Sequence, residues 1–97
     1  MRTDRCGDLR PEDQGRTVTL CGWVGRRREH GEHLAFVDLR DRSGIIQVVV
    51  DGAADLRSEY VIQVEGTVRQ RPNDTANASL ATGDIEIDAQ KVTVLSA

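Results

Sequence analysis

Residues 35–50 read AFVDLRDRSGIIQVVV, two apolar segments on either side of a short run of turn-forming residues. Over 35–39 every second residue is aliphatic, whereas Phe36 and Asp38 occupy the positions between. Because successive side chains of a strand point to opposite sides, this alternation predicts a strand with one apolar and one polar side. The apolar side belongs in a core, so Phe36 is expected on the outer side. The run over 45–50 predicts the next strand.

Three further segments are rich in Val, Ile and Thr and are bounded by Gly, Asp, Asn or Ser. They cover 18–24, 60–68 and 85–95, and each predicts a strand. With the two strands above, the chain is expected to be all-β.

Two short helical pieces are predicted beside these strands. The first lies at 10–15, where Pro11 suits a first turn and Gly15 ends it. The second covers 53–59, between the third and fourth strands. Residues 70–84 are expected to form a long loop, and loops of this length in small domains are often functional.

This order of elements is typical of an OB-fold, a five-stranded Greek-key barrel with a short helix between strands 3 and 4. A small SH3-like barrel also has five strands, but it lacks a helix at that place. The length of 97 residues fits one domain over 1–97.

Composition narrows the classes of function. The formal net charge of −3 argues against non-specific duplex binding, which needs a broad basic surface, but permits a local basic patch. No apolar run approaches the ~20 residues that span a membrane, and the first residues lack the apolar centre of a secretory signal. Without such a signal, Cys6 and Cys21 are expected to be thiols rather than a disulfide.

Three side chains on the expected outer side, those of Phe36, Gln47 and Glu86, have both a structural and a functional interpretation. Phe36 is either a ring half-covered by a loop or a platform on which an unpaired base stacks. Gln47 occupies either an edge position or one that reads base edges, since an amide both donates and accepts. Glu86 is either a solvated carboxylate or an acceptor for the N–H groups of a base. Arg69, with Arg71 two residues on, is expected to point outward from the end of the fourth strand.

A run of three arginines, 26–28, directly follows the first predicted strand. Alternation prevents all three from facing one partner, so either the run is a solvated strand end or Arg26 and Arg28 clamp a phosphate beside Phe36. His30 and His33 form an HxxH in the expected loop, without a third ligand at suitable spacing for a metal. No nucleophile, phosphate loop or acid–base pair is evident, so catalysis by these residues is not expected.

Several long motifs then identify a family. The segments VTLCGWVGRRREHG, FVDLRDRSGIIQVVV, LRSEYVIQVEGTVRQRP and LATGDIEI resemble, in this order, the N-terminal anticodon-binding domain of bacterial aspartyl-tRNA synthetase. The resemblance covers nearly the whole chain, and the related asparaginyl and lysyl enzymes match less closely. It implies an OB-fold that binds the anticodon loop of tRNA for aspartate, with guanine or a queuine-type derivative, then uracil, then cytosine.

The resemblance also assigns roles to individual residues. Phe36 matches the ring that stacks on the middle base, Gln47 matches a glutamine that contacts the anticodon, and Glu86 matches a base-reading carboxylate. The residues expected to touch RNA are Arg26, Arg28, His30, Phe36, Gln47, Arg69, Arg71, Asn77 and Glu86.

One residue bears on specificity within that family. Some members charge only tRNA for aspartate, whereas others also charge tRNA for asparagine, whose anticodon differs at the third base. The residue after the three arginines and an acid is commonly Leu in the first kind and His in the second. His30 therefore predicts the non-discriminating kind.

The resemblance places the chemistry elsewhere. In the family a hinge and a class II catalytic domain, with the sites for ATP, Mg²⁺ and aspartate, follow near the position of Ala97. This domain is thus expected to hold no catalytic residue, cofactor or metal, and its parent to be a cytoplasmic homodimer that binds no membrane. Two alternatives remain open, a free-standing single-stranded nucleic-acid-binding OB protein and a protein-interaction module.

Overall fold

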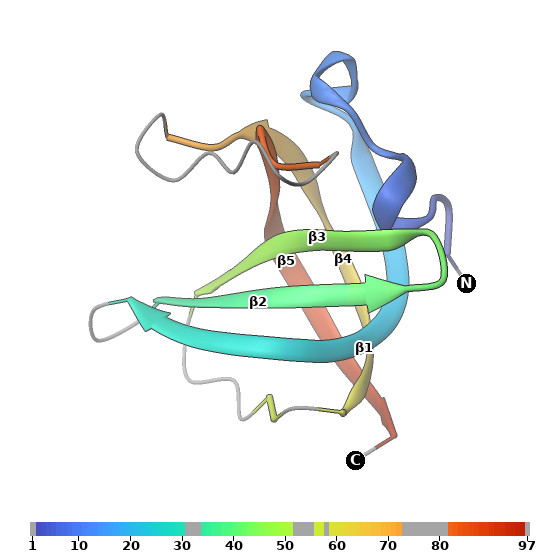
Figure 1. The fold of residues 1–97 in the computed structure, drawn as a ribbon, viewed down its shortest axis with the longest axis vertical. Coiled ribbons are helices and arrows are strands. Elements are labelled where there is room, and N and C mark those ends of the chain that lie inside the picture. Colours follow the sequence, from blue (N-terminus) through green and yellow to red (C-terminus); the bar gives the residue numbers. More distant parts are fainter. Residues whose placement is uncertain (1, 31–33, 52–55, 58, 73–81, 97) are drawn as a thin grey trace.

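The computed structural model describes residues 2–30, 34–51, 56–57, 59–72 and 82–96. In chain order their elements are two 3-10 helices and five strands (Figure 1): η1 (Cys6–Asp8), η2 (Pro11–Asp13), β1 (Thr17–His30), β2 (Leu34–Asp41), β3 (Gly44–Asp51), β4 (Val61–Gln70) and β5 (Ile85–Ser96). No helix in the described part of the chain is both long and apolar enough to span a membrane.

The five strands close into a barrel in the order β1-β2-β3-β5-β4. All neighbours are antiparallel except β3 and β5, which are parallel. The long β1 closes the barrel because its first half, up to Trp23, pairs with β4 and its second half with β2. This strand order, with its crossover, is that of the OB-fold, so the predicted fold class is confirmed.

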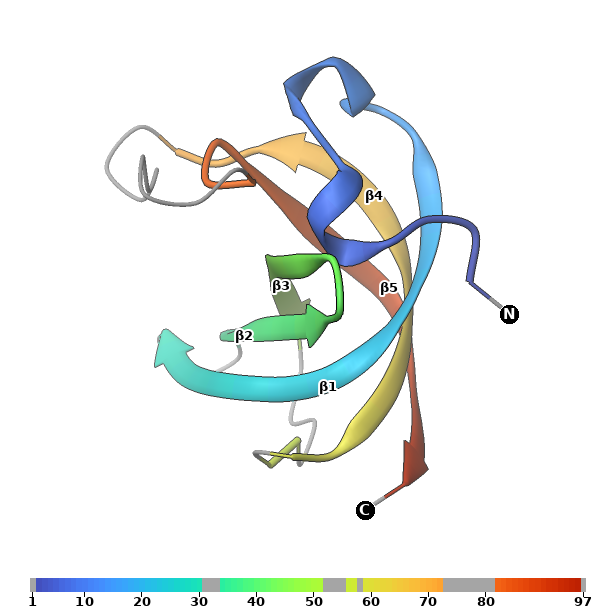
Figure 2. The ribbon, with the colours of Figure 1, turned by 45° about the vertical axis from the view of Figure 1, so that its right-hand side comes forward.

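Two glycines allow β1 to bend between its two partners. A Cβ atom added at Gly22 would lie 2.3 Å from the carbonyl oxygen of Arg40, so only glycine lets β1 cross β2 this closely. At Gly25 the pairing with β2 shifts by one residue, which is a β-bulge. The arc of β1 in Figure 2 shows that this strand curves around the barrel.

The core fills the interior with aliphatic side chains from all five strands. In β2 and β4 buried side chains alternate with outward-facing ones, as the sequence predicts, whereas β3 and the start of β5 bury consecutive residues. Fully or almost fully buried members include Val18, Leu20, Val24, Val37, Leu39, Ile46, Val48, Ile62, Val64, Val68, Ile85 and Ile87.

The N-terminal segment covers one end of this core, where η1 lies across the barrel (Figure 2). Cys6 and Leu9 are buried in the core cluster. The Cys6 backbone N–H donates to Asp41 Oδ2 at 2.9 Å, and the Gly7 N–H donates to Ser43 Oγ at 2.7 Å. These bonds join η1 to the turn between β2 and β3. Burial raises the pKa of the Cys6 thiol well above its ordinary value, with Asp41 adding to the effect. Cys6 and Cys21 are both free.

Two predictions concern the segments that precede and end β1. The helical piece at 10–15 is present as η2, and Gly15 follows it at φ 89°. The run 26–28 is not a loop start, because β1 continues through it to His30. At the bulge the strand turns from β4 onto β2, which gives these arginines a new ladder of hydrogen bonds.

The helix expected over 53–59 is wrong at the residues of that range that are described. Residues 56 and 57 have no regular structure, and Glu59 has φ 72°, which a right-handed helix excludes. Instead the Glu59 N–H donates to the Val24 carbonyl at 2.8 Å, and the Val24 N–H donates to the Tyr60 carbonyl at 2.8 Å. Backbone pairing with β1 therefore takes the place of helical bonds.

Candidate nucleic-acid interface

Two rows of outward-facing residues run around the barrel across all five strands. In one, backbone pairing places Asp38 next to Gln47, and Gln47 next to Glu86. Arg26 and Arg69 end this row on β1 and β4. The second row consists of Arg28, Phe36, Val49, Asp88 and Thr67. The pairing thus brings residues far apart in sequence onto one face.

A chain of hydrogen bonds connects four of these side chains. Arg28 Nη2 donates to Gln47 Oε1 at 2.9 Å, and Gln47 Nε2 donates to Glu86 Oε1 at 2.9 Å. From the other side, Arg69 Nε donates to Glu86 Oε2 at 2.7 Å. The amide of Gln47 is therefore oriented by a donor at one end and an acceptor at the other.

Acidic residues also pair with the two arginines, Arg28 and Arg69, at the ends of this series of hydrogen bonds. Arg28 Nη2 also donates to Asp38 Oδ1 at 3.2 Å, and Arg69 Nη1 lies 3.4 Å from Asp88 Oδ2. The Arg28 guanidinium lies 6.0 Å from the centre of the half-buried Phe36 ring, at the limit of a cation–π contact. We call these seven residues the outer-face network: Arg28, Phe36, Asp38, Gln47, Arg69, Glu86 and Asp88.

Burial distinguishes the centre of the network from its ends. Gln47 is only 2% exposed and Glu86 only 3%, whereas the side chains of Arg28 and Arg69 are 42% and 44% exposed. The interpretation of Gln47 as an edge position and that of Glu86 as a solvated carboxylate are therefore wrong, because β3 is paired on both sides and both side chains are buried. The parallel pairing of β3 with β5 places the two side chains side by side, and Arg28 bonds to Gln47 while Arg69 bonds to Glu86.

Arg71 was expected to point outward and does not. It is 6% exposed, and its Nε donates to the Ile85 carbonyl at 2.9 Å. The Arg71 N–H donates to the Asp84 carbonyl at 2.9 Å, which extends the antiparallel pairing of β4 with β5 by one residue beyond Gln70. Burial lowers the pKa of Arg71 and nearby Glu86 opposes this effect, but a guanidinium stays charged at neutral pH.

The remaining predicted site residues lie elsewhere. Arg26 is on the same face, but its exposed side chain lines a pocket with Trp23, Arg40 and Glu59 rather than joining the network. Asn77 and the side chain of His30 lie outside the described residues. The structure thus brings together five of the nine predicted residues: Arg28, Phe36, Gln47, Arg69 and Glu86.

Sequence reasoning missed the part played by Asp88. Its position two residues after Glu86 places it on the same side of β5, which is a signal that alternation could have supplied. Asp38, at the polar position two residues after Phe36, forms an ion pair with Arg28.

The network suits recognition of bases better than attraction of phosphates. Three acids, Asp38, Glu86 and Asp88, lie beside the two exposed arginines, so the positive charge is compensated locally. What the face offers is a half-buried ring, an oriented amide and a desolvated carboxylate. An unpaired base needs these groups, because it stacks by its face and hydrogen-bonds by its edge.

Comparison with known proteins relates this geometry to a family. The family model tRNA_anti-codon, described as an OB-fold nucleic acid binding domain, matches residues 18–95. A ligase from Arthrobacter sp. (strain FB24), named Aspartate--tRNA(Asp/Asn) ligase, is 59% identical over 99% of the chain and 16% of its own length. The ligase of the same name from Thermosynechococcus vestitus is 55% identical over 99% of the chain and 17% of its own length. The chain therefore spans about one sixth of these relatives.

Solved structures agree with the fold. Asparaginyl-tRNA synthetase from Pyrococcus horikoshii, in complex with asparaginyl-adenylate, superposes with a TM-score of 0.78 at 30% identity. The match covers 97% of this chain and 22% of that one. The OBody AM2EP06, bound to hen egg-white lysozyme, superposes with a TM-score of 0.81 at 22% identity, over 99% of this chain and 94% of that one. At that identity the second match supports the fold alone.

Proposed function

The chain belongs to the family of OB-fold nucleic acid binding domains, and we propose that it reads the anticodon loop of tRNA as part of an aspartate–tRNA ligase. The observation that carries the proposal is the outer-face network, where the Phe36 ring lies beside Arg28 and the bonded pair Gln47 and Glu86. In the whole protein, a cytoplasmic homodimer, the domain would position tRNA for aminoacylation. ATP and Mg²⁺ would act in the catalytic portion.

Each group of the network has a distinct part in reading the loop. Phe36 stacks on the middle base of the GUC anticodon, and stacking of this kind contributes ~1–3 kcal/mol per base. Glu86 accepts from the N–H groups of a base, such as those of guanine. Gln47 donates or accepts at a base edge.

Selectivity follows from the burial of these acceptors. In the free protein Arg28 fills Gln47 Oε1 and Arg69 fills Glu86 Oε2. A base that displaces either guanidinium must supply N–H donors in its place. A base that presents acceptors would leave a buried carboxylate or amide unpaired, at a cost of ~1–3 kcal/mol or more.

Affinity for matched RNA hairpins tests the proposal directly. An anticodon stem-loop with GUC and one with the middle base changed are titrated at two salt concentrations. We expect the GUC loop to bind more tightly, by about 1–3 kcal/mol per wrong base, at both concentrations. A free-standing single-stranded nucleic-acid binder would hold both loops equally, and that result would refute anticodon reading.

We further propose that the parent enzyme does not discriminate between tRNA for aspartate and tRNA for asparagine. His30 follows the three arginines and Glu29, and the relatives above carry Asp/Asn in their names. Replacing His30 by Leu is expected to favour the GUC loop over the GUU loop, whereas the unmodified chain binds both. A preference that does not move would remove His30 from the choice of the third base.

A further inference from the structure

The arginines of this acidic chain divide by whether their guanidinium groups have partners. All of them lie in the described part of the chain, and seven bond to acids, amides or carbonyls or make contacts of another kind. The guanidinium groups of the other five form no hydrogen bond or ion pair with any described residue: Arg2, Arg5, Arg26, Arg40 and Arg42.

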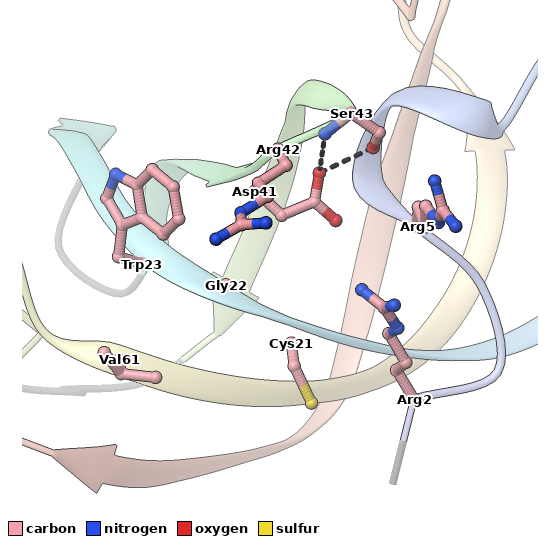
Figure 3. A pocket seen from close by; sticks show the side chains of 9 residues that line it. All are labelled: Arg2, Arg5, Cys21, Gly22, Trp23, Asp41, Arg42, Ser43 and Val61. Carbon is pink, nitrogen blue, oxygen red and sulfur yellow. Dashed lines mark hydrogen bonds between the residues drawn. The ribbon is translucent and has the colours of Figure 1, made fainter.

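All five unpaired arginines line two pockets that share the wall formed by Trp23. The larger pocket, of about 560 Å³, holds Arg2, Arg5 and Arg42. Figure 3 shows the Trp23 indole on one side of it and Arg2 and Arg5 on the other. The smaller, of about 260 Å³, holds Arg26 and Arg40. We call the five arginines and Trp23 together the Trp23 strip.

Few acids offset this charge. Asp41 lies in the larger pocket, but one of its oxygens accepts hydrogen bonds from Ser43 (Figure 3). Its other oxygen accepts from the Cys6 N–H. Asp38 and Glu59 line the smaller pocket. Five guanidinium groups against three carboxylates leave two positive charges on the strip, within a chain of net charge −3. Guanidinium groups recognise phosphate in a bidentate manner, so the strip suits a phosphate-bearing ligand.

The strip continues directly from the outer-face network. Asp38, which accepts from Arg28, also lines the smaller pocket, and Arg26 lies opposite it on β1. Phe36, Asp38 and Arg40 follow one another at every second residue of β2, on one side of the strand. From Phe36 to Arg40 the strand advances roughly 14 Å at about 3.4 Å per residue, which is comparable to several stacked nucleotides.

We propose that the Trp23 strip binds phosphate groups of the RNA strand that continues from the loop held at Phe36. The charges of the two surfaces indicate different roles for the outer-face network and the Trp23 strip. The network is compensated locally and reads bases, whereas the unpaired arginines of the strip attract the backbone. The proposal rests on the proposed function for the identity of the RNA, but its test is separate.

The first test measures the salt dependence of binding to the GUC stem-loop. The double variant Arg5→Ala/Arg42→Ala is compared with Arg16→Ala/Lys91→Ala, which removes the same charge away from the strip. Each lost phosphate contact lowers the slope of log K against log salt by about 0.7–0.9. Raising the salt from 50 to 200 mM weakens RNA binding by both variants. For the strip variant this weakening should be roughly 7- to 12-fold smaller than for the control variant. Equal slopes for the two folded variants, verified by circular dichroism, would overturn the proposal.

The second test uses the unmodified chain. Trp23 is the only tryptophan, so its fluorescence reports on the strip alone. The full stem-loop should change the Trp23 emission, whereas a short single-stranded oligonucleotide of the loop sequence should bind and leave it unchanged. Emission that stays constant at saturating stem-loop would contradict the proposal. Emission that responds to a polyglutamate peptide and not to RNA would assign the strip to a protein partner instead.

The two hypotheses fail in different ways. If anticodon reading is wrong, GUC and changed loops bind equally whatever the state of the strip. If the strip is wrong, the loops are still distinguished, but the strip variant follows the Arg16→Ala/Lys91→Ala control.

Discussion

Glu86 is the buried charge around which the outer-face network is arranged. A carboxylate removed from water is costly unless its oxygens are filled by good donors. Here Gln47 Nε2 fills one oxygen and Arg69 Nε the other, at 2.9 Å and 2.7 Å. The same desolvation that makes this arrangement necessary strengthens any hydrogen bond that the carboxylate makes with a base.

Replacing Glu86 by Gln tests this description. The amide keeps the shape of the carboxylate but has only one acceptor oxygen. Its NH₂ group therefore faces one of the two donors that Glu86 accepts from, Gln47 Nε2 or Arg69 Nε. We expect the free energy of unfolding to fall by about 1–3 kcal/mol, measured by urea denaturation. Glu12→Gln, on the exposed face of η2, is the control and should unfold like the unmodified chain. A Glu86→Gln chain as stable as that control would show that the network adds no stability.

At the scale of elements, one turn fixes η1 to the sheet. Asp41 Oδ2 accepts from the Cys6 N–H, and Asp41 Oδ1 accepts from Ser43. Partial burial acts to raise the pKa of Asp41, but the hydrogen bonds from Ser43 and Cys6 outweigh it and hold the pKa below its ordinary value. The charged form is therefore the one that the fold stabilises.

Asp41→Asn should weaken this attachment and change its pH dependence. We expect about 1–2 kcal/mol less stability near neutral pH, because one hydrogen bond and the charge are lost. A lowered folded pKa means that the native contribution is full above the unfolded pKa of about 3.9 and disappears as the pH falls through the folded value. The stability difference between the two chains should therefore shrink on acidification below about pH 4. A difference that is constant from pH 7 to 3 would contradict the role assigned to the carboxylate.

The elements also show what sequence patterns can and cannot predict. Alternation assigned the strands and placed Phe36 on the outer side, because period-two burial is a local property. It could not predict that Gln47 and Glu86 are buried, since each is covered by a neighbour that only barrel closure supplies. Arg71 was misplaced for the same reason, because its side chain bonds to the carbonyl of Ile85, a residue brought beside it by the pairing of β4 with β5. The resemblance to a family named candidate interface residues, and the geometry then showed which of these residues contact one another.

At the scale of the whole molecule, the surface proposed to read bases and the surface proposed to bind phosphates differ in charge. The chain carries a net charge of −3, the outer-face network is compensated, and the unpaired arginines gather beside Trp23. An acidic domain of this kind would repel duplexes in general and hold only a strand whose phosphates follow the strip. Base contacts would then specify, and phosphate contacts would position, as in other nucleic-acid complexes.

The central claim is that an unpaired base stacks on Phe36, and a double-mutant cycle measures this most directly. The chain and its Phe36→Ala variant are each titrated with the GUC stem-loop and with the same loop lacking its middle base, and exposed Leu95→Ala serves as the control. We predict a coupling energy of about 1–3 kcal/mol between the ring and the base, so that removing the base no longer matters once the ring is gone. Losses that simply add, with no coupling, would contradict the account.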